Sequence, residues 1–246
     1  MPGTAGGSVA LSVVMPAFNE SAILAESVEH VVKPLRERAE TFELLVVENG
    51  STDDTLAIAH RLGVEVPELR VVHRAVADYG AALRNGLIEA QGEIIVNFDC
   101  DYYDIDFLDR AVARLRGERA PAIVVGSKRA PGASDQRSAA RRAVTWGFST
   151  LLRLGFGLHV SDTHGMKAMR REAVLPYAEQ CTLGRDLFDT ELIVRAERGG
   201  LGVEEIPVAV VERRPARSPL ASRVPRTVWG LVTLRRALGW RSAPDR

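Results

Sequence analysis

The fold of this chain is decided by the stretch Ile94-Ile95-Val96-Asn97-Phe98-Asp99-Cys100-Asp101. Its apolar beginning predicts a short buried strand, which ends abruptly in two carboxylates one residue apart. Ligands of open α/β sheets bind where the strands end, so we expect Asp99 and Asp101 on the turn beyond the strand, both facing one divalent cation such as Mg²⁺. An Asp-x-Asp also starts loops as a turn former and helix cap, and the pair alone leaves this alternative open.

The composition is that of an ordinary globular protein. The chain has 246 residues, of which 46% are hydrophobic and 26% charged, enough for one large domain or a domain with a subdomain. The formal net charge is zero, which argues against a general nucleic-acid binder. The charge is nevertheless uneven, because from Glu212 to the end nine arginines stand against two acidic residues.

Cysteine usage and hydropathy indicate the compartment. Cys100 and Cys181 are the only cysteines, so a reducing compartment is the simpler inference. Residues 1–8 have no basic region before an apolar core and are expected to form a flexible tail, not a signal peptide. No stretch approaches the roughly 20 apolar residues of a membrane span. We therefore expect a cytoplasmic protein, with any membrane contact peripheral.

Strand-like and helix-like segments alternate along the first half. The pattern predicts strands over 11–15, 42–47, 69–73 and 93–98. It predicts helices over 23–35, 52–62 and 81–90. This alternation indicates an α/β fold with a mostly parallel central sheet and helices on both faces.

The second half is less regular. Helices are expected over 107–115, 146–154 and 187–198, and strands over 122–126, 167–169 and 203–211. Between them lies a long polar segment, 128–142, of the kind that more often forms a functional loop than a structural connection.

Polar loops follow three predicted strands at the same edge of the sheet. They are Pro16-Ala17-Phe18-Asn19-Glu20, Glu48-Asn49-Gly50-Ser51-Thr52-Asp53-Asp54-Thr55 and Asp99-Cys100-Asp101. Together they resemble the family 2 glycosyltransferases of the nucleotide-sugar-binding GT-A fold, most closely the dolichol-phosphate and polyprenyl-phosphate mannosyl or glucosyl synthases. The resemblance extends from about residue 11 to about residue 234.

The resemblance implies a donor nucleotide site. Pro16, Phe18 and Glu20 would pack the nucleoside, although an ordinary strand-ending turn is the alternative for the first two. Glu48 and Asn49 stand where the family usually has two aspartates, which leaves the identity of the base open.

The same resemblance implies a metal site. Asp99 and Asp101 match the family's Asp-x-Asp, which binds the Mg²⁺ or Mn²⁺ that bridges the donor diphosphate. Two departures from the family pattern favour an unusual donor or acceptor. Tyr103 replaces a Gln that lipid-phosphate relatives often carry, and Asp78-Tyr79-Gly80 lacks the Lys often found before the Gly.

The acceptor side is basic. Gly126-Ser127-Lys128-Arg129 resembles the family's Gly-Ser-Arg. By this resemblance the acceptor and its phosphates would be bound by Ser127, Lys128, Arg129, Arg137, Arg141 and Arg214, and Arg142 is assigned a catalytic role. Guanidinium groups suit phosphate because they stay charged and bind its oxygens bidentately. A solvated surface is the alternative for each arginine.

Phe188-Asp189-Thr190-Glu191-Leu192 matches the family's Phe-Asp-x-Glu-Leu. On a helix the two carboxylates point to different sides, so at most one faces the crevice. Asp189 is the candidate catalytic base, or an acceptor-orienting residue, if the acceptor is an alcohol; an ionised phosphate needs no base. The alternative is a buried carboxylate satisfied by Arg185 or a backbone amide. His164 lies in a segment similar to the family's Asp-Thr-x-x-Gly-Phe-Lys. A lone histidine more often has a structural role than a role in a functional site.

The C-terminal residues 224–240 predict a basic amphipathic helix. Such a helix favours an anionic membrane surface, and it resembles the part of the lipid-phosphate enzymes that lies near the membrane. Docking of its apolar face on the core or on a second subunit is the equal alternative.

These observations predict a metal-dependent, inverting glycosyltransferase that moves a hexose from a nucleoside diphosphate sugar, such as GDP-mannose or a UDP-sugar, to a polyprenyl phosphate. A soluble acceptor such as a nucleoside or secondary metabolite is the alternative, and a non-catalytic binding module is a weaker one. A homo-oligomer is compatible with the sequence. The expected organisation is a tail (1–8), one catalytic domain (9–211) with nucleotide-binding (9–105) and acceptor (106–211) halves, and a basic C-terminal segment (212–246).

Overall fold

The structure is a computed structural model. It describes residues 8–130, 132–135, 146–147, 150–153, 155–210, 229–230 and 232–238. The predictions made for residues 1–7, for 136–145 and for 211–228 lie outside the described residues.

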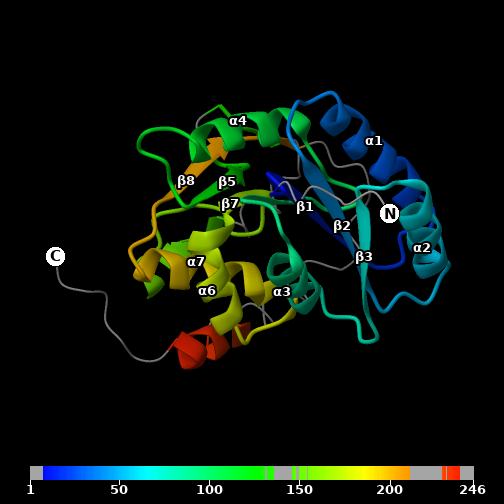
Figure 1. The fold of residues 1–246 in the computed structure, drawn as a ribbon. Helices are drawn as coiled ribbons and strands as arrows, with labels where there is room; N and C mark the ends of the chain where they lie inside the picture. Colours follow the sequence, from blue (N-terminus) through cyan, green and yellow to red (C-terminus); the bar gives the residue numbers. More distant parts are fainter. Residues whose placement is uncertain are drawn as a thin grey trace.

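A seven-stranded sheet forms the centre of the molecule, with the strand order β3-β2-β1-β4-β7-β5-β8 (Figure 1). Its strands are β1 (Leu11–Ala17), β2 (Phe42–Asn49), β3 (Leu69–Arg74), β4 (Ile94–Asn97), β5 (Ile123–Ser127), β7 (Lys167–Arg170) and β8 (Val203–Pro207). All neighbours pair in parallel except β7, which runs antiparallel to both β4 and β5. The mostly parallel sheet is thus confirmed, and it continues through both halves of the chain.

Helices cover both faces of the sheet. On one face lie α1 (Leu24–Arg36), α2 (Thr55–Glu65) and α4 (Ile105–Leu115) (Figure 1). On the other lie α3 (Tyr79–Glu89), α6 (Arg171–Gln180) and α7 (Phe188–Arg198), which follows the short 3-10 helix η1 (Arg185–Leu187). Two short strands, β6 (Ser134–Asp135) and β9 (Ala209–Val210), pair separately.

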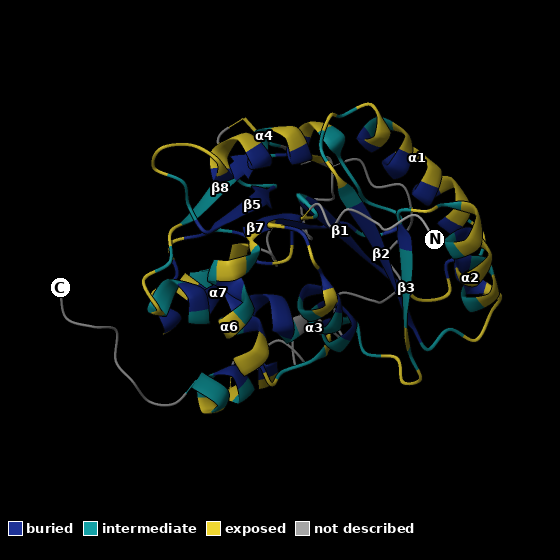
Figure 2. Cartoon of the chain, viewed as in Figure 1, coloured by how far each residue is buried: buried dark blue, intermediate teal, exposed yellow. Residues whose placement is uncertain are grey.

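The strands are apolar on both sides because both faces are covered. In β1, Val13 and Met15 pack into the core beneath α1, α2 and α4, whereas Val14 packs into the core beneath α3, α6 and α7. The buried colour therefore fills the inner strands of the sheet and the inward sides of the helices, the edge strands β3 and β8 are mostly intermediate, and the exposed colour lies on the outward sides of the helices (Figure 2).

Three elements differ from the sequence-based prediction. Helix α6 was not predicted, because its short length, Pro176 and only two buried residues, Val174 and Ala178, give a weak helical period. The strand expected over 203–211 is divided into β8 and β9. Helix α1 ends at Arg36, one residue beyond its predicted end, and includes Pro34.

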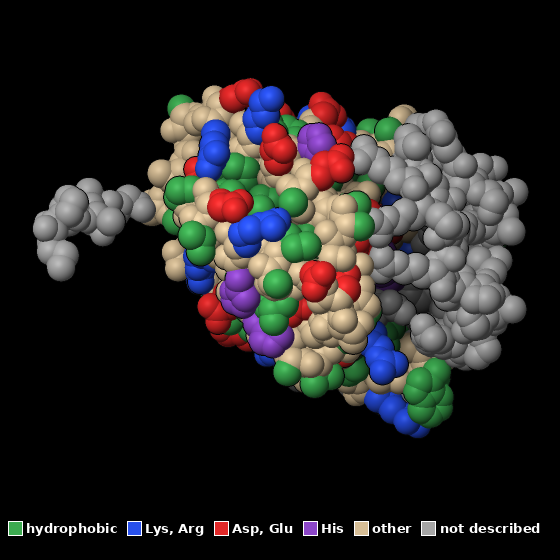
Figure 3. Space-filling model, turned by 90° about the vertical axis from the view of Figure 1, so that its right-hand side faces the viewer, with side chains coloured by type: hydrophobic (Ala, Val, Ile, Leu, Met, Phe, Trp, Pro, Cys, Tyr) green, Lys and Arg blue, Asp and Glu red, His purple; other side chains and the backbone are tan. Residues whose placement is uncertain are grey.

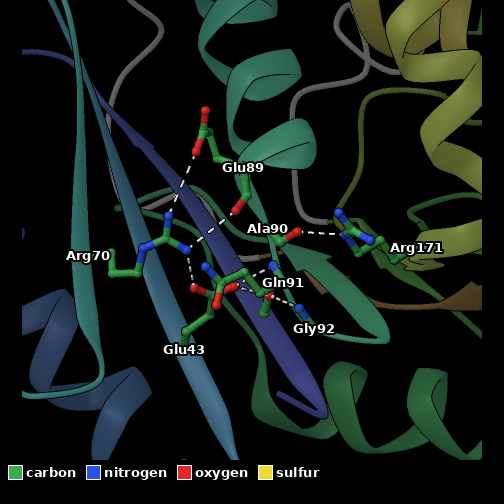
Figure 4. A network of polar contacts seen from close by, with 8 residues as sticks. Glu43, Arg70, Glu89, Ala90, Gln91, Gly92 and Arg171 are labelled. Atoms are coloured by element: carbon green, nitrogen blue, oxygen red, sulfur yellow. Dashed lines mark hydrogen bonds and ion pairs between the residues drawn. The ribbon is translucent and has the colours of Figure 1, made fainter. Parts of the chain in front are cut away.

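A buried carboxylate fastens the amino edge of the sheet, opposite the edge where the parallel strands end (Figure 4). Glu43 in β2 is 5% exposed and accepts hydrogen bonds from the Ser12 hydroxyl (2.6 Å) and the Gln91 amide (2.6 Å). Its second oxygen accepts one from Arg70 of β3 at 2.6 Å. The network joins β1, β2, β3 and the turn before β4 at the edge where these strands begin. It fixes the register of the strands and therefore also the positions at which they end at the opposite edge.

The side of the molecule that carries α1 and α2 shows acidic and basic side chains interspersed among its described residues (Figure 3). Arg36 of α1, for example, pairs with Glu68 at 2.7 Å. The described side chains of this face form no continuous basic patch.

Candidate active site

A tight turn follows β4 and carries both carboxylates of the opening stretch. The Asp99 amide donates to the Tyr102 carbonyl at 3.0 Å, and the Tyr102 amide donates back at 3.1 Å. Because this turn lies beyond the end of the strand, Asp99 and Asp101 escape the alternation that would point them to opposite faces. Asp104, by contrast, caps α4 by accepting a hydrogen bond from the Phe107 amide at 3.1 Å.

Asp99 lies in an acidic and secluded environment. Its Oδ1 accepts a hydrogen bond from the Tyr79 hydroxyl at 2.9 Å. Burial, together with the charges of Asp101 and Asp189, raises the pKa of Asp99 to about 6, although the Tyr79 bond and the charge of Lys167 oppose the rise. Burial and the nearby carboxylates also raise the pKa of Tyr79 well above its ordinary value, so its hydroxyl keeps its proton.

Beside the turn lies a buried ion pair. Lys167 Nζ lies 2.6 Å from Asp189 Oδ1 and donates to the Gly165 carbonyl at 2.9 Å. The Lys167 amide donates to the Asn97 side chain at 3.0 Å, which places the pair next to the end of β4. Asp189 is therefore a buried, satisfied carboxylate, as the alternative expected, but its partner is Lys167 in place of Arg185 or a backbone amide.

Lys167 was not predicted as a site residue. The signal available in the sequence was a lysine inside a short strand candidate, between the apolar residues Met166 and Ala168. A lysine with 1% exposure is rare unless it is paired, and here the pairing carboxylate comes from a helix 22 residues further along the chain.

The donor set fits a divalent cation. Asp101 and the Oδ2 atom of Asp99 accept no hydrogen bond from any described residue, so their oxygens are open to a ligand. The charges of Asp101 and Asp189 both act on Asp99 and that of Lys167 opposes them, so a cation would relieve the excess of negative charge among these described residues. The described residues contain no cluster of three or more His, Cys, Asp or Glu arranged to hold a metal. A pair of carboxylates is what Mg²⁺ or Mn²⁺ needs where diphosphate oxygens and water complete its shell.

The first two loops are tied together at the same edge of the sheet. The Asn19 amide donates to the Ser51 hydroxyl at 3.0 Å, and the Asn19 side chain accepts from the Thr52 amide at 2.8 Å. Of the predicted nucleoside contacts, Pro16 is buried within β1, Phe18 is 37% exposed, and Glu20 is 8% exposed at the base of the loop. Among these three, Phe18 presents the open surface against which a base or ribose can stack.

Glu48 lies in the predicted place but is sequestered. One oxygen accepts from the Ser51 amide at 2.6 Å, and the other lies 2.6 Å from His73 Nδ1. Burial, which alone would raise the pKa of Glu48, is outweighed by these two partners, so the pKa is lowered. With Glu48 1% exposed, it is the imidazole of His73, 45% exposed, that reaches solvent here. Sequence reasoning missed His73 because its pairing depends on the register of β2 and β3.

Asn49 is also occupied. Its side-chain oxygen accepts from the Asp78 amide at 2.9 Å, and Asp78 in turn caps α3 by accepting from the Ala81 amide at 2.9 Å. Gly50, at φ 69°, makes this turn possible, since an added Cβ would lie 3.0 Å from the Ala75 carbonyl and be strained. The second loop is thereby fastened to the start of α3.

The predicted acceptor residues divide into two groups. Ser127 is fully buried and accepts from the Arg129 amide at 3.1 Å, so it shapes the turn after β5. Lys128 places Nζ 5.7 Å from the centre of the Tyr102 ring, beside the carboxylate turn, and Arg129 donates weakly to the Ser161 carbonyl at 3.5 Å. The remaining calls, Arg137, Arg141, Arg142 and Arg214, lie outside the described residues and stay predictions.

Asp189 and Glu191 point to different surroundings, as helical spacing predicts. Glu191 is fully buried and accepts from the Thr182 and Leu183 amides at 3.0 and 2.8 Å, with Arg195 bound to its other oxygen. It holds the loop before α7 and lies away from the carboxylate turn. His164 is exposed, and its Nδ1 lies 3.1 Å from the Thr163 hydroxyl.

The described part of the C-terminal helix docks on the core. Leu234 is fully buried, and Arg195 of α7 donates to the Ala237 carbonyl at 3.4 Å. The outer side of the same helix leaves Trp229 66% and Val232 40% exposed. Core docking thus accounts for one side of this helix only. No helix in the described ranges has both the length and the apolar character that crossing a membrane demands.

Comparison with known families gives a match over most of the chain. The family described as Glycosyl transferase family 2 matches residues 12–176. Among curated proteins, glycosyltransferase AglD of Haloferax volcanii is 34% identical over 210 residues, covering 83% of this chain and 33% of that protein. A dolichyl-phosphate beta-glucosyltransferase of Trichomonas vaginalis is 30% identical, covering 82% of this chain and 65% of its own length. The chain thus spans less than two thirds of these two relatives.

Two further similarities extend over more of the matched protein. The undecaprenyl-phosphate mannosyltransferase of Micrococcus luteus is 29% identical over 237 residues, covering 89% of this chain and 93% of that protein. Among solved structures, glucosyl-3-phosphoglycerate synthase from Mycobacterium tuberculosis, crystallised with Mn²⁺, UDP-glucose and phosphoglyceric acid, superposes with a TM-score of 0.68 at 24% identity. That superposition covers 95% of this chain and 81% of the other, and it shows that the two share a fold.

Proposed function

Because the chain belongs to glycosyl transferase family 2, we propose that it is a metal-dependent, inverting glycosyltransferase that transfers a hexose from a nucleoside diphosphate sugar to a polyprenyl phosphate. The observation that carries this proposal is the pair of open carboxylates, Asp99 and Asp101, on a turn next to the buried Lys167–Asp189 pair. The curated relatives that act on dolichyl phosphate and undecaprenyl phosphate support the choice of acceptor.

The donor side follows from what the loops offer. Phe18 provides a stacking surface after β1, and His73 provides a polar group near the end of β3. Asp99 and Asp101 would hold a divalent cation on the diphosphate. When bound, this cation supplies the positive charge that stabilises the diphosphate as it leaves the sugar.

The acceptor side favours an ionised nucleophile. Asp189 is 2% exposed and its Oδ1 is engaged by Lys167, so it is poorly placed to take a proton from an alcohol. A phosphate oxygen is already ionised at neutral pH and needs positioning and charge compensation instead. Lys128, beside the carboxylate turn, can supply the charge, and Asp189 fixes Lys167 within the site.

A lipid acceptor requires contact with a membrane surface, and two neighbouring segments offer one. Arg235 of the C-terminal helix donates to the Gly155 carbonyl at 2.7 Å and lies over the Phe156 ring, so the helix adjoins the segment around 150–156. Among the described residues of the C-terminal helix and of 146–156, the exposed large apolar ones are Trp146, Leu151, Trp229 and Val232, and the exposed arginines are Arg153 and Arg236. Tryptophan and arginine at an apolar surface fit the headgroup region of an anionic membrane.

A soluble acceptor is the second candidate. The fold neighbour from Mycobacterium tuberculosis was crystallised with phosphoglyceric acid, a small acceptor that also carries a phosphate. Tyr79 and Tyr103 depart from the pattern of the lipid-phosphate enzymes, which favours this candidate too.

A donor-by-acceptor screen with mass detection tests both candidates. The full chain is incubated with UDP- and GDP-hexoses, Mg²⁺ or Mn²⁺, and either undecaprenyl phosphate in detergent or a set of soluble phosphates and alcohols. The proposal expects a hexosyl lipid phosphate. A product formed only from soluble acceptors would replace it with the second candidate, and no transfer from any donor would contradict both.

A further inference from the structure

Tyr79 contacts one of the two open carboxylates directly. Its hydroxyl donates to Asp99 Oδ1 at 2.9 Å, while Asp99 Oδ2 accepts no hydrogen bond from the described part of the chain. The phenol therefore occupies one oxygen of Asp99 and leaves the other without a donor among the described residues. A carboxylate that binds a cation through a single oxygen depends on such a contact for its direction.

The backbone that carries Tyr79 is fixed by two other segments. The preceding residue, Asp78, donates its amide to the Asn49 side chain at 2.9 Å. The Asp78 carboxylate accepts from the Ala81 amide at 2.9 Å and from the Arg185 amide at 2.7 Å. The start of α3 is thus held between the second loop and the turn before α7.

The residue after Tyr79 leaves no room for this helix end to shift. A Cβ added at Gly80 would lie 2.7 Å from the Arg185 carbonyl oxygen and 2.7 Å from Phe188 Cβ. Contact this close means that the first turn of α3 packs backbone to backbone against η1 and α7. The backbone position of Tyr79 is therefore set by the fold and not by its contact with Asp99.

Asp99 is equally constrained from its own side. Its amide and carbonyl both bond to Tyr102 across the turn, so the Tyr79 bond completes the orientation of a side chain whose backbone is already fixed. A phenol is a neutral donor. It directs the carboxylate and leaves intact the negative charge that attracts a cation. A lysine in the same place would cancel that charge.

We propose that Tyr79 is a positioning residue for the divalent cation. Its hydroxyl directs Asp99 Oδ2 towards the ion and adds no charge to the site. This inference rests on the proposed function, because Asp99 is a ligand only if the site binds a divalent ion. It goes beyond it by assigning to α3 a role in metal affinity that is separate from donor and acceptor binding.

The test is a titration of the full chain with Mn²⁺ alone, in which electron paramagnetic resonance measures the concentration of the free ion. Tyr79→Phe removes the hydroxyl and keeps the ring, and we expect the dissociation constant for Mn²⁺ to rise about tenfold. Tyr177→Phe is the matched control, because its hydroxyl donates to the Gly199 carbonyl in a contact that does not involve the carboxylate pair. The control is expected to bind Mn²⁺ as the unchanged protein does.

A double-mutant comparison separates positioning from a general loss of structure. If Tyr79 acts through Asp99, Tyr79→Phe changes the Mn²⁺ dissociation constant by less than about twofold when it is added to the Asp99→Asn variant. In the unchanged protein the same substitution raises this constant about tenfold. In turnover, the metal concentration for half activity rises in Tyr79→Phe while kcat at saturating Mn²⁺ is retained. A merely structural role predicts a fall in kcat as well.

The outcomes are distinguishable. Unchanged Mn²⁺ affinity in Tyr79→Phe overturns this inference and leaves the proposed function intact. An equal effect of Tyr79→Phe with and without Asp99→Asn also overturns it. Failure of the unchanged protein to bind Mn²⁺, with or without a nucleoside diphosphate, overturns both the inference and the metal-dependent function.

Discussion

Lys167 Nζ and Asp189 Oδ1 lie 2.6 Å apart, and the two side chains are only 1% and 3% exposed. A strand of the sheet and a helix of the second half thus meet in a buried ion pair directly beside the carboxylate turn. Removing one member of such a pair leaves an uncompensated buried charge, which is far more costly than removing both.

Lys167→Met is therefore expected to lower the free energy of unfolding by about 3 kcal/mol or more, because Asp189 would remain buried without its partner. The double variant Lys167→Met, Asp189→Leu is expected to recover much of this loss. Urea denaturation of the single and double variants measures both effects. A free energy of unfolding of Lys167→Met within about 1 kcal/mol of that of the unchanged protein would show that Lys167 does not compensate a buried charge on Asp189.

The amino edge of the sheet offers a second stability test. Glu43→Ala leaves Ser12, Arg70 and the Gln91 amide without their common partner, and we expect a loss of about 3 kcal/mol in unfolding free energy. Glu89→Ala is the matched control, since Glu89 reaches Arg70 only at 3.7 Å and is 54% exposed. Its loss is expected to stay below about 1 kcal/mol, and equal losses from the two variants would contradict the role given to Glu43.

Asp53 predicts a pH dependence of stability. Burial is the largest single influence on its pKa and raises it, but the hydrogen bonds from Thr55 and Ser21 together outweigh burial and lower the pKa from 3.8 to about 2. Because the folded-state pKa lies below the unfolded one, the stabilisation is present above pH 3.8 and is lost as the pH falls towards 2. The stability difference between the unchanged protein and Asp53→Asn should therefore shrink over this window. A difference that stays constant from pH 5 to pH 2 would contradict the assignment.

The outer side of the C-terminal helix predicts membrane binding. Trp229→Ser with Val232→Ser should reduce sedimentation with vesicles of phosphatidylcholine and phosphatidylglycerol, because both residues are exposed and apolar. Val64→Ser, at an 87% exposed position on α2, is the control and should leave sedimentation unchanged. If the unchanged protein does not sediment, the membrane contact is removed from the account; if all three sediment equally, the contact lies elsewhere.

The first half of the fold could be predicted because its signals are local. Apolar β-branched runs and polar strand ends specify β1 to β4, and the Asp99–Asp101 turn lies at the predicted edge. What escaped prediction depends on pairings distant in the sequence. The antiparallel insertion of β7 between β4 and β5 brings Lys167 to Asp189, and the register of β2 and β3 brings His73 to Glu48.

Residue identity alone also did not show which site residues have side-chain oxygens available to a ligand. Glu48 and Asn49 lie at the predicted sheet edge, but neighbouring amides and His73 occupy their acceptor oxygens, which no spacing rule reveals. Tyr79 stood out in the sequence only as a departure from a family pattern. In the structure its hydroxyl donates to Asp99, a contact that the sequence did not predict.

The central claim is metal-dependent transfer of a hexose to a polyprenyl phosphate at the Asp99–Asp101 turn. Its most direct test is mass detection of hexosyl undecaprenyl phosphate formed by the full chain with and without EDTA, compared with Asp101→Ala and with Asp106→Ala, a control at an exposed carboxylate of α4. The account predicts product from the unchanged protein and from Asp106→Ala only when Mg²⁺ or Mn²⁺ is present, and none from folded Asp101→Ala. Full product formation by Asp101→Ala, or in EDTA, would contradict it.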